Sequence, residues 1–471
     1  MKTITFHPEF PAPAGGENGT GGSDGGALMG IWRAWNRFWF SPADPLPLGV
    51  IRIFTGMVVL YIHLIYSLDL MSMVGPDGWM DWSATKALRY EAPYYHLPMN
   101  WTSTGSEEEI GVPIWSVFFH ISDPGWIVTM HVTFLVVMFL FTIGFATRLT
   151  SVLTWFAVLC YIHRLPVFMY GMDSMMNVAV LYLMIGPSGA TLSVDRLIAK
   201  WWARKRGLPP PVVKPSVPAN FALRMMQIHF CFIYMASGLS KLKGPAWWNT
   251  NAYWDTLANP EFTMIYYRWY ESLVREMVSS HVLYSVLAAA VVGFTFFCEI
   301  GLPFLVWTRL RPFIVVCGFF LHAGIAVFMG LWIFSLLMMT MLLGYLPGAA
   351  IRDRIFGTAA DGRRLALRFL PSSDRQVRAA ALARALDFDN RVDVVAATAG
   401  QPSVRVVADG REVTGPAAAA ALFDNLGWLR PVRWVLRLPG LGGTVARWLS
   451  GEAAPGAAVK TPGKPQIPAA S

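Results

Sequence analysis

Apolar residues occur along most of this chain in runs of roughly 20 residues, separated by polar segments. A run of roughly that length lets a helix cross the hydrocarbon core of a bilayer. We expect helices over residues 46–70, 126–145, 149–169, 174–185, 221–242, 282–307, 313–329 and 331–346. The pattern therefore predicts an all-α polytopic membrane protein with about eight transmembrane helices.

The pattern changes after residue 349, where shorter segments alternate. Strands are predicted at Leu365–Leu370, Val392–Ala396 and Val404–Val407, and helices at Ser373–Leu386, Pro416–Leu426 and Leu429–Leu438. Asp409 and Gly410 are typical of a hairpin turn. We therefore expect a small α/β domain over residues 350–450, after a transmembrane domain over residues 30–349.

Both ends of the chain have compositions that are typical of disorder. Residues 1–29 are rich in Gly, Pro and polar residues, and residues 451–471 are of low complexity. No continuous apolar stretch follows Met1 and Lys2, so we expect no cleavable signal peptide. Ile31–Phe40 combines aromatic residues with arginines, which predicts a short helix in the membrane interface.

The charges of the polar segments predict the orientation of the helices. If the N-terminus is inside, the inner segments contain the basic residues near 33–37, 148, 196–214, 309–311 and 352–354, and residues 71–125 form an acidic outer loop. Basic loops favour the cytoplasmic side of a membrane. We therefore expect a multi-pass protein of the bacterial cytoplasmic (inner) membrane, with both termini and the α/β domain in the cytoplasm and the lipid bilayer as its partner.

The composition narrows the class of protein. Hydrophobic residues make up 55% of the chain and charged residues only 14%, which is far more apolar than a soluble domain. The formal net charge is +9, but no basic stripe is interleaved with stacking aromatics, so nucleic-acid binding is not expected. The four cysteines lie in apolar runs without a CxxC pair, so we expect neither a disulfide framework nor a metal site.

The stretch Phe221–Asp255 contains the strongest candidate for chemistry. Gln227, Tyr234 and Lys241 are seven residues apart and fall near one line of a helix. Polar side chains in an apolar helix are costly unless they meet partners or a wet cavity. Burial disfavours the charged form of an amine, so Lys241 could act as a neutral base. The alternative is a lysine that reaches the headgroups from the helix end and does no chemistry.

Other polar residues could line the same outward-facing site. His163 and Arg164 end the third helix on the expected outer face, either as interfacial anchors or beside Lys241. Asp173 either caps the fourth helix or pairs with Arg164 or Lys241. A carboxylate beside Lys241 would hold the lysine protonated, which opposes its use as a base.

Two further ionisable residues lie inside later helices. Glu299 is an intramembrane carboxylate, which indicates function unless it forms a structural pair with His322 or Arg52. Arg52, near the start of the first helix, is expected to snorkel to the inner interface. His322 is interpreted as a satisfied core histidine, with a binding role as the alternative. Trp247, next to Trp248, belongs either to an interfacial aromatic belt or to a quinone or lipid contact.

Five stretches carry a resemblance to a known family. They are TRLTSVLTWFAVLCYIHRLPVFMYGMDSMMNVAVLYL, SVDRL, FIYMASGLSKLKGPAWW, FFCEIGLPFLVW and FLHAGIAVFMGLWIFSLLM. In this order they resemble the HTTM (horizontally transferred transmembrane) domain proteins, bacterial relatives of vitamin K-dependent gamma-glutamyl carboxylase. The resemblance covers about residues 31–350. Residues 350–450 are similar to a DCC-type thioredoxin-like module, which is degenerate here because LPSSD, at Leu370–Asp374, occupies the place of the redox cysteines.

The resemblance implies a chemistry and a site. In the carboxylase, a deprotonated lysine starts the oxygenation of reduced vitamin K, and the strong base that results removes a proton from glutamate, to which carbon dioxide adds. A reduced quinone is therefore the implied cofactor, with Lys241 in the place of that lysine. Carboxylase members have a histidine where this chain has Asp173, and a large lumenal domain for which this sequence shows no counterpart. The implied catalytic residues are Lys241, Asp173 and His163, and the implied binding residues are Arg164, Gln227, Tyr234, Trp247, Glu299 and His322.

Two classes of function remain open. The first is a carboxylase-like or quinol-oxygenase-like membrane enzyme that acts on a quinol or another lipid-soluble substrate with Lys241 as base. The alternative is a non-catalytic membrane protein, such as an immunity, export or sensor component. An enzyme requires Lys241, His163 and Tyr234 to converge on one cavity, whereas a structural protein would scatter them.

The charge asymmetry generates a prediction about topology. Single cysteines introduced within residues 71–125 should react with a membrane-impermeant thiol reagent from the periplasm, and those within residues 197–215 only from the cytoplasm. Labelling of intact and of permeabilised cells measures the difference. The opposite pattern of labelling would invert the topology and place Lys241 on the inner face.

Overall fold

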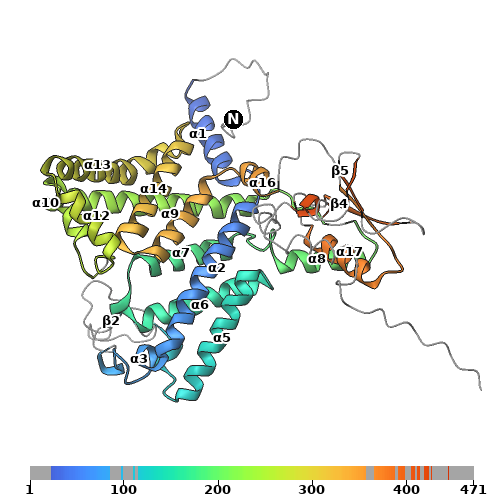
Figure 1. Cartoon of the computed structure of the whole chain (residues 1–471), viewed down its shortest axis with the longest axis horizontal. Helices are drawn as coiled ribbons and strands as arrows, with labels where there is room; N and C mark the ends of the chain where they lie inside the picture. The colour runs from blue at the N-terminus through green and yellow to red at the C-terminus, as the bar shows by residue number, and fades with distance from the viewer. Residues whose placement is uncertain are drawn as a thin grey trace, which may run out of the picture. The chain divides into compact units, whose positions relative to one another are not determined.

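The computed structural model describes residues 23–84, 115–209, 211–261, 263–356, 365–387 and 391–397, with shorter pieces between residues 97 and 444. The chain divides into two compact units (Figure 1). The helical unit comprises Met1–Arg196 and Val213–Ala349, and the C-terminal unit comprises Leu197–Val212 and Ala350–Ser471.

The helical unit consists almost entirely of α-helices. They are α1 (Ser23–Phe40), α2 (Leu46–Tyr66), α3 (Leu70–Val74), α5 (Pro124–Ile143), α6 (Thr147–Arg164), α7 (Gly171–Ile185), α9 (Val217–Leu242), α10 (Pro245–Trp248), α11 (Asn251–Leu257), α12 (Arg268–Val278), α13 (His281–Leu305), α14 (Arg311–Met329) and α15 (Trp332–Leu342). The 3₁₀ turn η5 (Leu343–Tyr345) continues α15, and β1 (Leu97–Pro98) pairs with β2 (Ile110–Gly111). Two helices lead into the C-terminal unit, α8 (Val194–Lys205) and α16 (Gly348–Phe356).

The first helix differs from the expectation. A helix was predicted only over Ile31–Phe40, and residues up to 29 were predicted to be disordered, but α1 begins at Ser23. Ala27, Leu28 and Met29 are strong helix formers that join the glycines before them to the aromatic segment. Residues 1–22 lie outside the described residues.

Four described helices are long and apolar enough to cross a membrane. They cover Leu46–Val74, Pro124–Ile143, His281–Leu305 and Arg311–Met329, and two apolar helices, Gly171–Ile185 and Trp332–Tyr345, are shorter. The protein is therefore a helical protein of membrane type. The number of membrane crossings stays a prediction.

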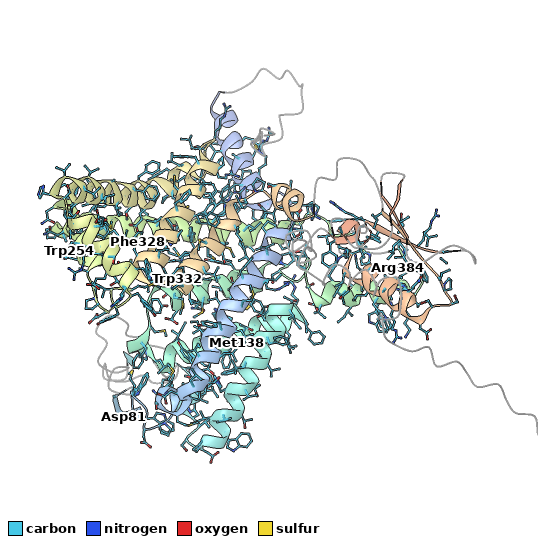
Figure 2. All side chains as sticks on the ribbon, in the orientation of Figure 1. Asp81, Met138, Trp254, Phe328, Trp332 and Arg384 are labelled. Atoms are coloured by element: carbon cyan, nitrogen blue, oxygen red, sulfur yellow. The ribbon has the colours of Figure 1, made fainter. Side chains whose placement is uncertain are left out.

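The helices of the helical unit pack as two connected groups. α2, α5, α6 and α7 contact one another in sequence, and α9, α13, α14 and α15 form the other group (Figure 1). α2 and α7 pack against α15, and α7 packs against α9, so one continuous core joins the groups. Met138 of α5 is fully buried in this core (Figure 2).

Small residues set the closest approaches between these helices. A Cβ added to Gly56 of α2 would lie 2.5 Å from the hydroxyl oxygen of Thr142 on α5. A Cβ on Gly238 of α9 would lie 2.8 Å from Ile300 and 3.2 Å from the Cβ of Glu299 on α13. Glycine thus lets α9 and α13 approach each other at the level of the candidate site, as small residues do in membrane helix pairs.

A second, smaller core covers one end of α13. It consists of Tyr253, Leu257, Tyr270, Val274, Ala288 and Val292, from α11, α12 and α13. The hydroxyl of Tyr270 donates to the carbonyl oxygens of Leu257 (3.1 Å) and Phe328 (2.9 Å). The segment between α9 and α13 therefore packs against α13 and, through Phe328, against the end of α14.

The C-terminal unit contains a four-stranded sheet. Its strands are β3 (Leu365–Phe369), β4 (Val392–Ala396), β5 (Arg405–Ala408) and β6 (Arg411–Val413), and its helix α17 covers Asp374–Leu386. The order is β4-β3-β5-β6, with β3 and β4 parallel and the other pairs antiparallel. The expected turn at Asp409 and Gly410 and the expected helix Leu429–Leu438 lie outside the described residues.

The environment of Arg52 corrects one expectation. Its guanidinium is fully buried against other protein groups, whereas a snorkelling side chain has an exposed head group. It donates to the carbonyl oxygens of Ser188 (2.5 Å), Thr191 (3.3 Å) and Leu192 (2.5 Å) in the turn between α7 and α8. The carbonyl oxygens of a buried turn are not all satisfied by helix or strand hydrogen bonds, so they need other donors. Arg52 supplies these donors.

We expect Arg52→Met to destabilise the helical unit by about 3 kcal/mol or more, because buried acceptors left without a donor cost about 1–3 kcal/mol each. Thermal unfolding in detergent micelles measures the loss. Arg37→Met is the matched control, since Arg37 is an exposed arginine of α1. An equal, small effect of both substitutions would show that Arg52 does not hold the turn.

Candidate functional site

Gln227, Tyr234 and Lys241 form the polar stripe of α9, and each side chain contacts a different element. The amide nitrogen of Gln227 donates to the carbonyl oxygen of Gly344 in η5 (2.7 Å). The hydroxyl of Tyr234 is 2.6 Å from Nε2 of His322 on α14. The ammonium of Lys241 lies 2.8 Å from Oε1 of Glu299 on α13. Helical spacing therefore predicted the stripe, and the fold supplies each partner.

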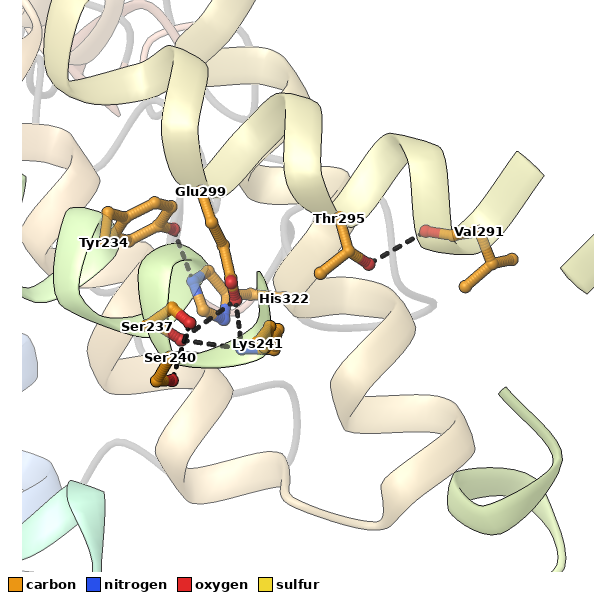
Figure 3. A network of polar contacts seen from close by, with 8 residues as sticks. All are labelled: Tyr234, Ser237, Ser240, Lys241, Val291, Thr295, Glu299 and His322. Carbon is orange, nitrogen blue, oxygen red and sulfur yellow. Dashed lines mark hydrogen bonds and ion pairs between the residues drawn. The ribbon is translucent and has the colours of Figure 1, made fainter. Parts of the chain in front are cut away.

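Lys241 and Glu299 form an ion pair between α9 and α13 (Figure 3). The side chain of Lys241 is 21% exposed and that of Glu299 is 10% exposed. The hydroxyl of Ser237 lies 2.7 Å from the lysine nitrogen and 3.2 Å from Oε1 of Glu299. Because the pair is largely removed from water, its attraction is stronger than that of a surface pair, but its desolvation is costly.

This pair replaces the partners expected for Glu299. His322 and Arg52 were the candidates, but Arg52 binds the turn between α7 and α8. Lys241 reaches Glu299 because Lys241 and Gly238 lie on the same face of α9, and Gly238 contacts α13 at Glu299.

Ser237 is a residue of the site that the sequence pattern did not single out. It lies four residues before Lys241, so the two side chains are neighbours on the helix surface. That spacing was the signal that could have identified it. The hydroxyl of Ser240 donates to the carbonyl oxygen of Ser237 (2.8 Å) at the edge of these contacts (Figure 3).

Aromatic rings cover the lysine end of the site. The lysine nitrogen is 5.3 Å from the ring centre of Trp247, a cation–π distance. Trp247 and Trp248 both contact Phe296 of α13, with ring centres 5.8 and 6.2 Å apart. Trp247 is thus part of the site rather than of a belt alone.

Tyr234 and His322 form a second hydrogen-bonded pair, between α9 and α14. His322 is 3% exposed and Tyr234 is 2% exposed. Among the described residues, Oε2 of Glu299 and Nδ1 of His322 have no hydrogen-bond partner.

Three other predicted site residues have roles elsewhere. Nδ1 of His163 pairs with the carbonyl oxygen of Trp115 (2.8 Å). Arg164 is fully buried and donates to the carbonyl oxygens of Val74 (3.1 Å), Gly75 (2.5 Å) and Met80 (2.8 Å).

Asp173 lies in the first turn of α7, where its carboxylate accepts from the backbone N–H of Tyr170 (3.1 Å). Within the part of the chain that the structure describes, neither His163 nor Asp173 forms a hydrogen bond or ion pair with Lys241. Among the described residues, Lys241 bonds to Ser237 and Glu299, Tyr234 bonds to His322, and His163 bonds to Trp115, so no hydrogen bond brings the three predicted residues together.

A cavity of about 250 Å³ lies elsewhere in the helical unit. Its lining includes Thr147, Arg148, Ser151, Gly189 and Asp195, and none of the Lys241 network. The Asp195 carboxylate in its wall already accepts three hydrogen bonds from Ala146 and Thr147. Its polar groups therefore hold the start of α6, and the residues around Lys241 lie outside it.

No metal site is found in the described ranges, since they contain no group of three or more His, Cys, Asp or Glu residues that could hold an ion. Comparisons of the chain with protein-family models, curated proteins and solved structures found no match. The interpretation of the site therefore rests on its geometry.

Replacing one residue of the Lys241–Glu299 pair should lower the free energy of unfolding more than replacing both. We expect Glu299→Leu or Lys241→Met to lower the free energy of unfolding by roughly 3 kcal/mol, because each leaves a charge or its partner without compensation. The double variant should lose less than either single one. Unfolding in detergent measures all three.

The pair formed by Glu271 and Arg275 is the control, because its side chains are 46% and 76% exposed. Its removal should change the stability by about 0.5 kcal/mol or less. Additive losses at Lys241 and Glu299 would contradict a coupled buried pair.

Proposed function

We propose that this protein is a membrane enzyme in which Lys241 exchanges a proton with a lipid-soluble substrate. The observation that carries the proposal is the Lys241–Glu299 ion pair, in which Glu299 lies inside α13, a helix apolar enough to cross a membrane. Because the carboxylate favours the charged lysine, the amine can accept a proton only once Glu299 is protonated or displaced. Ionisable residues inside such helices are expensive and mark proton or substrate sites. Tyr234 of the same α9 stripe and His322 of α14 form a hydrogen-bonded pair that adds two further proton-carrying groups.

The surroundings of the lysine favour an aromatic, apolar substrate. Trp247 and Phe296 present ring surfaces beside the ammonium, and the side chain of Lys241 keeps a fifth of its surface exposed. A planar molecule that reaches this edge could stack on a ring and place a hydroxyl group at the amine. The resemblance to HTTM domains supports a quinol as this substrate, with a carboxylase-like or quinol-oxygenase-like reaction.

The membrane arrangement belongs to the same proposal. About eight crossings in the inner membrane, with both termini in the cytoplasm, fit the basic segments that alternate with the apolar helices. In this topology Lys241 lies at the outer end of α9. A substrate dissolved in the bilayer would then reach the lysine from the side.

We propose that the C-terminal unit is a degenerate thioredoxin-like module. A parallel β3–α17–β4 unit with the antiparallel strands β5 and β6 in the same sheet supports this, since thioredoxin-like folds combine these parts. Ser372 and Ser373 precede α17 where redox cysteines would fall. Without thiols there, the unit carries no dithiol chemistry.

A second candidate is a non-catalytic membrane protein, such as an immunity, export or sensor component. The observation that favours it is that Gln227, Tyr234 and Lys241 all have partners within the chain. A purely structural stripe would look the same in this respect. The two candidates differ in what happens when Lys241 is replaced by another cation.

The test uses a short-chain naphthoquinol as the probe, with the full chain in nanodiscs and oxygen present. We expect the protein to accelerate quinol consumption, and Lys241→Arg to lower the rate at least about 100-fold, because general-base catalysis contributes about 10²–10⁴-fold. Arginine remains protonated and cannot accept the proton.

Lys243→Arg is the matched control, since Lys243 lies two residues further along and should leave the rate unchanged. Oxygen uptake and quinol absorbance measure the reaction. A folded Lys241→Arg protein with full activity rules out the base role. If wild-type protein does not accelerate consumption, the non-catalytic candidate is favoured.

A further inference from the structure

The outward face of α8 is apolar, whereas its inward face carries cations. Ile198, Trp201 and Trp202 recur at helical spacing and are 38%, 55% and 44% exposed. Arg196 and Lys200, four residues apart, lie on the opposite side of the helix and are each 8% exposed. A helix in water places its apolar residues inward and its charged residues outward. The outward face of α8 is therefore suited to apolar surroundings rather than to water.

Cations border this apolar face at the end of the helix. The Lys205 ammonium lies 5.3 Å from the ring centres of both Trp201 and Trp202, and the Arg206 guanidinium lies 5.3 Å from the ring centre of Trp202. These are cation–π distances. Tryptophan with Lys or Arg at its edge is typical of helices that lie in the membrane interface, where the ring meets the acyl chains and the cation meets the headgroups.

The start of α8 is fixed at the end of a helix of membrane length. The backbone N–H of Asp195 donates to the carbonyl oxygen of Gly144 (3.0 Å), the residue that follows α5. The Asp195 carboxylate accepts from the backbone N–H groups of Ala146 (2.7 Å) and Thr147 (2.8 Å), where α6 begins. Because α5 is long and apolar enough to cross a membrane, its end marks the edge of the apolar layer. The first turn of α8 therefore lies at the level of that edge.

The charge of this segment selects the kind of lipid that it would meet. Residues 196–214 contain six Lys and Arg residues and no Asp or Glu. The Asp195 carboxylate, just before them, is already bound to the start of α6. Each cation near a membrane surface strengthens binding to anionic headgroups about fivefold. The segment is therefore complementary in charge to anionic phospholipids.

We propose that α8 lies along the membrane surface and binds anionic phospholipids there, with Ile198, Trp201 and Trp202 among the acyl chains just below the headgroups. Lys205 and Arg206 extend from the edge of the rings to the phosphate groups. The occupant of this face is the bilayer in which the protein resides, because α8 starts at the edge of its apolar layer and carries the charge opposite to that of the headgroups. This contact is separate from Lys241 and from any reaction there.

A nitroxide label on Ile198→Cys measures the depth of this face and leaves both tryptophans in place. The full chain is placed in nanodiscs of phosphatidylglycerol and phosphatidylcholine, and its four native cysteines are buried. Oxygen concentrates in the apolar layer and a nickel chelate in water, so their relative collision rates with the label report its depth. We expect a depth of about 5–10 Å below the headgroups. Val377→Cys on α17 is the matched control, since Val377 is 39% exposed and its label should stay in water.

A second readout tests the charge of the lipid. Phosphatidylglycerol and phosphatidylcholine with the same photoreactive group are added in turn to the nanodiscs, and mass spectrometry gives the labelling of the peptide that contains α8. We expect the anionic probe to label this peptide at least about 25-fold more than the zwitterionic probe, the factor for two cations. Lys205→Gln combined with Arg206→Gln should lower this preference by about the same factor. Arg378→Gln, at an exposed cation of α17, should leave it unchanged.

Three outcomes overturn the proposal. A label at Ile198→Cys that meets the nickel chelate as readily as the label at Val377→Cys places the face in water. A label that neither oxygen nor the chelate reaches shows that protein covers the face, such as a second copy of the chain. Equal labelling of α8 by the two lipids removes the selection by charge. If Ile198→Cys does not fold, the lipid labelling of wild-type protein decides. Neither experiment measures quinol consumption, so failure here leaves the proposed function unaffected.

Discussion

The structure depends on one constraint: a polar group inside an apolar helical protein must find its partner within the chain. The pair of Lys241 and Glu299 is the clearest case, because it connects α9 to α13 and is covered by Trp247. Ser237 contributes a hydroxyl to both charges. The pair therefore contributes both to the packing of two helices and to the chemistry that we propose there.

Two buried arginines satisfy the same constraint in a different way. Arg52 and Arg164 are both fully buried, and each donates to three backbone carbonyl oxygens in a turn. A guanidinium has five donors in a rigid fork, so it can satisfy several carbonyls at once. These arginines hold the connections between helices, whereas the lysine faces a single carboxylate that can exchange a proton. The two arginines thus have a structural role, whereas Lys241 is the candidate for a chemical role.

The contacts of this site can be interpreted as structural or as chemical. Each residue of the α9 stripe has a partner, as a structural stripe requires, but Glu299 and His322 each retain a buried atom without one. A purely structural network gains stability from complete satisfaction. An incomplete one has a place for a mobile proton or a bound water. Among the described residues, Nε of Arg52 is also without a partner, so such atoms do not by themselves distinguish a chemical site from a structural one.

The sequence by itself determined the helical class and the position of the polar stripe. Runs of apolar residues and a seven-residue spacing are local properties of the chain, so they can be read without knowing the fold. It could not determine that Glu299 pairs with Lys241, because 58 residues separate the two side chains along the chain. That pairing depends on the close approach of α9 and α13 at Gly238, which only the tertiary structure decides. For the same reason Arg52 and Arg164, which look interfacial in sequence, are buried donors for turns that are distant in sequence.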